Sequence, residues 1–154
     1  MLIKTLNKNP RPPFITSTLQ QEAARKLRFS ADQTMRTAQT LYEKAHITYM
    51  RTDSPVIVSE GITQIRNVIE DRYGSKYLTS QPRVYKSKSK QAQEAHEAIR
   101  PTNAGKYPSG AGLSGDEARL YELIWNRAVS SQMESADVTQ TDIFISSVGN
   151  TEAC

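Results

Sequence analysis

The sequence predicts a mainly α domain with short strands, and three observations support this fold class. Four segments carry apolar residues three and four positions apart, the spacing that places them on one face of a helix. Residues typical of helix starts and ends border these segments. Only two short stretches are rich enough in β-branched and aromatic residues to form strands.

The first part of the chain predicts an irregular segment and then a helix. Residues 1–13 contain three prolines, which exclude a helix there: Pro10, Pro12 and Pro13. Ser17 followed by Gln20 is a capping-box pattern, and an apolar stripe continues from it to Leu27. We therefore expect the first helix to run from Ser17 to Leu27.

Ser30 and Gln33 repeat the capping pattern and begin a second, longer helix. Its expected apolar face consists of Ala31, Met35, Ala38, Tyr42 and Ala45. Two helices joined by so short a break fit a helix-turn-helix, and the alternative is a plain αα-hairpin.

The middle of the chain predicts an extended segment and a third helix. Ile47–Arg51 is β-branched and aromatic, which favours a short strand or extended backbone. A helix is expected over about 59–73, with Gly74 at its C-terminal end. Its inward residues are expected to be Ile62, Ile65 and Ile69.

The last third predicts loops, a fourth helix and a strand. Residues 80–113 are loop-like apart from one helical turn, because they are rich in proline and glycine. Ser114 and Glu117 predict the start of a helix to about Met133, with an apolar face of Ala118, Tyr121, Ile124, Trp125 and Ala128. Val138–Val148 predicts one strand without an obvious partner, which indicates a mainly α piece of something larger.

Composition narrows the class of protein. No apolar run approaches the roughly 20 residues that cross a bilayer, and the N-terminal residues do not resemble a secretory signal. The single cysteine, Cys154, allows no internal disulfide. A cytoplasmic protein without a membrane partner is therefore expected.

The net charge of +4 is unevenly distributed. Residues 1–51 hold nine Lys/Arg and three Asp/Glu, giving +6, whereas residues 101–154 hold three and seven, giving −4. This asymmetry indicates a nucleic-acid-facing front half, and the alternative is an ordinary solvated surface with clustered charges.

The densest candidate site is the segment that contains Tyr49, Arg51, Thr52 and Asp53. Alternate residues of an extended chain share a face, so Tyr49, Arg51 and Asp53 are expected to point the same way. A tyrosine oxygen can act as a covalent nucleophile, and a neighbouring guanidinium can bind phosphate oxygens. The alternative is a packed tyrosine beside a surface ion pair.

His96 and Arg100 form the second candidate. On one helical turn they would lie on a common face, where the two could clamp a phosphate. The alternative is a hydrogen-bonded structural histidine. His46 is interpreted as a linker residue. The scattered carboxylates predict no metal site in this chain.

Three segments in order resemble type IA DNA topoisomerases: Pro13–Ala23 (PFITSTLQQEA), Ile47–Ser54 (ITYMRTDS) and Gln93–Thr102 (QEAHEAIRPT). Leu120–Trp125 (LYELIW) is similar to a fourth segment. The resemblance covers about residues 12–148. Met50 resembles the topoisomerase I branch of the family rather than the topoisomerase III branch.

The resemblance implies a role for each matching residue. Tyr49 matches the nucleophile that joins the enzyme to the 5′ phosphate of one cut DNA strand. Arg51 matches an arginine that positions the scissile phosphate, and His96 matches a histidine that contacts the same region. Asp53 and Arg100 match motif positions expected to orient these groups, as does Thr52.

The resemblance also implies an architecture. Residues 13–134 are expected to form a tyrosine-bearing helix-turn-helix domain similar to that of catabolite activator proteins. Residues 1–12 and 135–154 are expected to be stubs of an adjacent gate domain. The family has a glycine in the turn before the tyrosine segment, where this chain has Ala45 and His46.

The implied activity is relaxation of negative supercoils by cleavage, strand passage and religation, without ATP. The expected partners are DNA, preferably single-stranded, and the remaining domains of the same protein, in a monomer. Magnesium is expected only in the full-length enzyme, through an acidic Toprim domain that this chain lacks, so the chain alone is expected to be inactive. The alternatives are a non-enzymatic DNA-binding helix-turn-helix module and a purely structural interaction domain.

Overall fold

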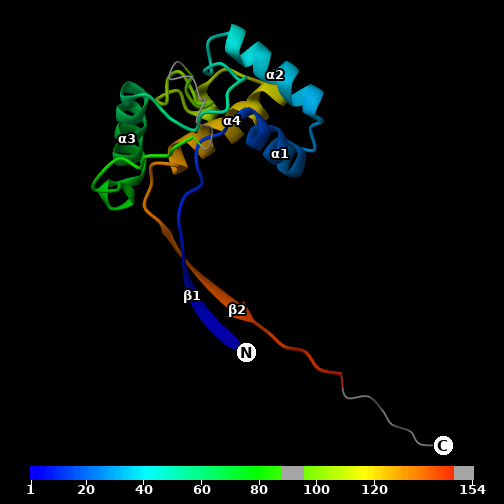
Figure 1. The fold of residues 1–154 in the computed structure, drawn as a ribbon, viewed down its shortest axis with the longest axis vertical. Coiled ribbons are helices and arrows are strands. Elements are labelled where there is room, and N and C mark those ends of the chain that lie inside the picture. Colours follow the sequence, from blue (N-terminus) through cyan, green and yellow to red (C-terminus); the bar gives the residue numbers. More distant parts are fainter. Residues whose placement is uncertain (88–95, 148–154) are drawn as a thin grey trace, which may run out of the picture.

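The computed structural model describes residues 1–87 and 96–147. Within these ranges four α-helices and two strands follow one another as β1 (Leu2–Lys8), α1 (Thr16–Leu27), α2 (Ala31–Glu43), α3 (Ser59–Tyr73), α4 (Gly115–Ser130) and β2 (Ala136–Asp142). Figure 1 shows the helices gathered at one end of the molecule and the two strands extending away from them. The predicted mainly α class is confirmed.

The strands β1 and β2 form an antiparallel ribbon, from the pair Leu2 and Asp142 to the pair Lys8 and Ala136. The predictions of an irregular segment over residues 1–13 and of an unpartnered terminal strand are therefore wrong. The prolines follow β1 and do not interrupt it. The strand predicted over Val138–Val148 is also misplaced, because β2 begins and ends earlier. Residue 148 lies outside the described residues.

The first two helices begin differently. At α1 the N-cap position is Ile15, whose N–H donates to the Thr18 hydroxyl at 3.0 Å, so the prediction of Ser17 as the cap is wrong. At α2 the prediction is confirmed, because the Ser30 hydroxyl accepts from the N–H of Gln33 at 3.1 Å.

The buried face of α2 differs from the predicted one. Its buried residues are Thr34, Ala38 and Leu41, while Tyr42 is exposed. A threonine can lie in this core because its hydroxyl donates to the carbonyl of Ser30 at 2.9 Å, which satisfies the polar group. The predicted helical spacing of the apolar residues was correct, but packing against α1 and α4 determines which face of α2 is buried.

The helices α3 and α4 match their predicted cores closely. Ile65 and Ile69 of α3 are buried, and Gly74 ends this helix with a φ of +99°, which favours glycine. Four residues of the predicted α4 face are buried: Tyr121, Ile124, Trp125 and Ala128. Because α4 contacts α1, α2 and α3, it is the centre of the helical domain.

The segment 96–101 is extended, so the predicted helical turn is wrong for these residues; its first part, 93–95, lies outside the described residues. Ile99 forms a β-bridge with Phe14, and Pro101 forms one with Ile47. Three segments remote in the sequence thereby meet at one place. Of the segment Ile47–Arg51, predicted as a short strand or extended backbone, only Ile47 takes part in a β-bridge, and Thr48 and Met50 lie at bends.

Candidate active site

The loop after Ile47 presents alternate side chains to solvent. Tyr49, Arg51 and Asp53 are exposed, with Tyr49 at 43%, whereas Met50 is 1% exposed and Ser54 is buried. The buried side chains anchor the loop in the core. Since this loop is irregular, the alternation follows from anchoring and not from a strand ladder.

Thr16, in the first turn of α1, binds the loop on both sides of Arg51. Its hydroxyl donates to the carbonyl of Met50 at 2.7 Å and accepts from the N–H of Thr52 at 2.9 Å. Its own N–H donates to the carbonyl of Thr52 at 3.0 Å. The start of α1 therefore sets the backbone from which the Arg51 side chain projects.

Thr48 binds the loop to the extended segment that follows His96. Its N–H donates to the carbonyl of Arg100 at 2.9 Å, and its hydroxyl donates to the carbonyl of Ala98 at 2.7 Å. The N–H of Arg100 in turn donates to this hydroxyl at 3.0 Å. The tyrosine loop and the histidine segment are thus held in one register.

An open groove of about 500 Å³ brings four of the predicted site residues together: Arg51, Thr52, Asp53 and His96. Its other wall is the beginning of α1, from Ile15 to Ser17. Arg51 also lines a second groove, along the outer face of α2 with Met35 and Gln39. The groove holds the carboxylate of Asp53, but the guanidinium of Arg51, the imidazole of His96 and the N-terminus of α1 that also face it suit an anionic ligand.

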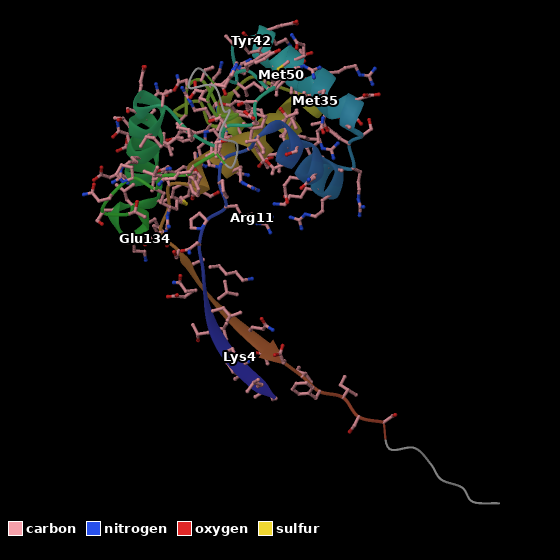
Figure 2. The ribbon with its side chains drawn as sticks, in the orientation of Figure 1. Lys4, Arg11, Met35, Tyr42, Met50 and Glu134 are labelled. Atoms are coloured by element: carbon pink, nitrogen blue, oxygen red, sulfur yellow. The ribbon has the colours of Figure 1, made fainter. Side chains whose placement is uncertain are left out.

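Tyr49 lies against Tyr42 of α2, beside these grooves and not among their lining residues. The two rings meet edge to face, with centroids 5.2 Å apart and an interplanar angle of 62°. Figure 2 labels Tyr42 on α2. Sequence analysis missed Tyr42, which it assigned to the apolar core face of this helix.

Arg100 is buried and does not share a helical face with His96, so the predicted clamp of these two side chains is wrong in its geometry. The guanidinium donates to both carboxylate oxygens of Glu97, at 2.9 and 3.2 Å, and to the carbonyl of Pro101 at 3.1 Å. It packs on Gly61, where an added Cβ would lie 2.8 Å from its Cζ. His96 itself is exposed.

The turn before the tyrosine loop ends α2 with a left-handed residue, Ala45, at a φ of +59°. Its N–H donates to the carbonyl of Tyr42 and that of His46 donates to Leu41, the pattern of a Schellman cap. Burial and the charges of Lys106 and Lys44 lower the pKa of His46, whose ring contacts Tyr121. His46, interpreted from the sequence as a linker residue, therefore also caps α2 through its backbone N–H and packs against Tyr121.

The described residues contain no group of three or more His, Cys, Asp or Glu side chains that could hold a metal ion. The sequence-based expectation about metal binding in this chain stays a prediction. The helices described here also include none with the length and apolarity needed to span a membrane.

A family model described as DNA topoisomerase matches residues 3–153. The chain belongs to the DNA topoisomerase family. The match includes both the tyrosine loop and the histidine segment, so the resemblance drawn from the motifs is confirmed.

Individual topoisomerases agree with this assignment. The DNA topoisomerase 1 of Synechococcus elongatus is 52% identical over 143 residues, and that of Zymomonas mobilis is 54% identical over 140. These alignments cover 92% and 91% of this chain but only 16% and 11% of the relatives. The full-length topoisomerase I from Thermotoga maritima superposes with a TM-score of 0.75 at 40% identity, over 90% of this chain and 23% of that chain.

Proposed function

We propose that this chain supplies the nucleophile of a type IA topoisomerase reaction in a longer protein. The phenolic oxygen of Tyr49 attacks a DNA phosphorus and forms a phosphotyrosine bond to the 5′ phosphate. The bond from phosphorus to the 3′ oxygen breaks, and the leaving oxygen takes a proton while the phenol loses one. Reversal of this step reseals the strand, so the bond energy is conserved and no ATP is used.

The residues around Tyr49 have distinct proposed roles. Arg51 binds the scissile phosphate through its planar guanidinium and stabilises the charge that develops during attack. His96 contacts the same phosphate from across the groove that it shares with Arg51. Asp53 and Thr52 orient this loop; the Thr52 hydroxyl accepts from the N–H of Ser54 at 3.1 Å.

Arg100 acts as a positioning residue and not as a phosphate ligand. Its guanidinium is held by Glu97, and its backbone binds Thr48, the residue before the nucleophile. Loss of this side chain would therefore shift the backbone of Arg100 and, through its hydrogen bonds to Thr48, the tyrosine loop.

The single observation that carries the proposal is the exposure of Tyr49 on a loop whose neighbour Arg51 shares a groove with His96. The backbone of this loop is hydrogen-bonded at Thr48, Met50 and Thr52, more than a surface tyrosine without a role requires. The loop is instead held as a nucleophile would have to be, since catalysis depends on alignment of the reacting atoms.

The remaining proposals concern the full-length protein. The full-length protein passes the intact strand through the gap and relaxes negative supercoils. It is a monomeric cytoplasmic enzyme that prefers single-stranded DNA.

The domain architecture is also part of the proposal. The helix pair α1 and α2 is proposed to be the helix-turn-helix of residues 13–134, with residues 1–12 and 135–154 belonging to a gate domain. Magnesium is proposed to bind a separate acidic domain.

A chimera tests the proposal. This chain replaces the matching segment of the Synechococcus elongatus DNA topoisomerase 1, and the product is incubated with a single-stranded oligonucleotide and then denatured. We expect a 3′-end label, and not a 5′-end label, to become covalently attached to the protein. Tyr49→Phe should abolish attachment and relaxation, and the isolated 154-residue chain should relax no plasmid.

The other outcome would favour the alternative function. If Tyr49→Phe leaves relaxation by the chimera intact, the chain is a DNA-binding module and the tyrosine is incidental. Relaxation by the isolated chain would contradict the proposed need for further domains.

A further inference from the structure

A third groove, of about 440 Å³, lies between α1 and α4, away from the tyrosine loop. Five cationic side chains and two acidic ones line it, an excess of three positive charges. The cations are Arg11, Arg25, Lys26, Arg119 and Arg127, and the acids are Glu22 and Glu122. The groove of Arg51 and His96 is lined by the first residues of α1, whereas Arg25 and Lys26 belong to the last turn of this helix. A helix of this length spans roughly 18 Å, so the two sites are distinct.

One buried carboxylate organises three of these cations. Glu22 accepts from Arg25 at 2.9 and 3.0 Å and from Arg11 at 3.3 Å, and Lys26 lies 3.7 Å away. The hydrogen bond from Arg25 lowers the pKa of Glu22, which is therefore ionised. Its side chain is 10% exposed, whereas those of the three cations are more than half exposed. Three solvent-facing cations thus share one negative charge.

Arg127 lies where the groove meets the core. Its Nε donates to the carbonyl of Pro12 at 2.6 Å, and its guanidinium lies 4.5 Å from the centre of the Phe14 ring. Burial lowers the pKa of Arg127, and the charge of Glu22 opposes this effect. Within residues 1–87 and 96–147 no carboxylate lies close enough to form an ion pair with Arg127, so an anion that enters the groove would stabilise this partly desolvated guanidinium further.

We propose that the groove between α1 and α4 binds the phosphates of a nucleic-acid backbone, at a site separate from the tyrosine loop. Guanidinium groups bind phosphate oxygens in a fork geometry, and four of the five cations are arginines. The cations come from α1, α4 and the segment before α1, where Figure 2 labels Arg11, and several cations in one groove suit a chain of phosphates. This site belongs to DNA positioning and not to the cleavage step.

The salt dependence of DNA binding by the 154-residue chain tests this proposal. The affinity for an oligo-dT strand is measured by fluorescence anisotropy over a range of KCl concentrations. Removal of two phosphate contacts by the double variant Arg25→Gln/Lys26→Gln should reduce the slope of log K against log salt by about 1.4, since each contact to a single strand contributes about 0.7. The matched control is Lys4→Gln/Lys8→Gln, which removes the same charge from the exposed strand β1.

The proposal is overturned if the groove variant and the β1 control change the slope equally. Arg119→Gln provides an independent variant if the double variant fails to fold, and it should reduce the slope by about 0.7. If the groove substitutions leave the slope unchanged but lower the melting temperature of the chimera, the proposal is also overturned. The groove would then be assigned to contact with an acidic surface of another domain. Binding needs no tyrosine chemistry, so this result does not depend on the proposed cleavage reaction.

Discussion

The hydroxyl of Thr16 donates a 2.7 Å hydrogen bond to the backbone carbonyl of Met50, 34 residues further along the chain. The same oxygen accepts from the N–H of Thr52. A helix that carries none of the proposed reacting groups therefore determines where Arg51 is placed.

We expect Thr16→Val to lower the rate of DNA cleavage by the chimera by roughly 10-fold or more, because an error of about 1 Å in the position of a catalytic group can reduce the rate 10²-fold. Thr16→Ser keeps the hydroxyl and should retain most of the activity. Thr63→Val is the matched control, since the Thr63 hydroxyl is exposed and binds only its own helix. Equal cleavage by the valine and serine variants at position 16 would contradict the positioning role.

We expect Tyr42→Leu to reduce the yield of covalent complex about 2- to 10-fold, because an edge-to-face ring pair is worth about 0.5–1.5 kcal/mol. Tyr42→Phe keeps the ring beside Tyr49 and should behave like the parent chimera. The yield is measured after rapid denaturation. A loss with phenylalanine as large as that with leucine would show that the Tyr42 hydroxyl matters and the ring contact does not.

Ala45→Gly is expected to raise the free energy of unfolding by about 1 kcal/mol, because a left-handed backbone disfavours any side chain with a Cβ. Urea denaturation of the 154-residue chain measures this. Ala24→Gly provides the opposite control: Ala24 is exposed within α1, where glycine should lower the free energy of unfolding by about 1 kcal/mol. A loss of stability in both variants would contradict the strain at Ala45.

Gly61→Ala is expected to lower the free energy of unfolding by about 1–3 kcal/mol, although alanine normally stabilises a helix. The added Cβ would lie 2.8 Å from Arg100 and from Ile57. Gly110→Ala, with no atom within 4 Å of its added Cβ, is the control. A more stable Gly61→Ala variant would mean that Arg100 does not need its close packing on α3.

The pH dependence of stability should contain a contribution from His46. Burial lowers its pKa in the folded state below the ordinary value of 6.5, so the unfolded chain binds more protons in acid. The contribution to stability is present above pH 6.5 and is lost as the pH falls through the lowered value. Urea denaturation at several pH values should show a smaller decline for His46→Gln, and an identical decline would contradict this origin.

Local patterns in the sequence predicted much of the fold. The helices α3 and α4 and the cap of α2 at Ser30 depend on interactions between residues a few positions apart. The motifs around Tyr49 and His96 indicated the family because residue identity and order suffice for that comparison.

The amino-acid sequence by itself therefore determined the helical segments, the family and the candidate residues. Only the tertiary structure decided the pairing of β1 with β2, the buried face of α2, the extended course of residues 96–101 and the burial of Arg100 against Gly61. It also placed Thr16 under the loop of Arg51. Each of these depends on groups that are distant along the chain, whose contacts exist only once the helices have packed around α4 and brought them within hydrogen-bonding or van der Waals distance.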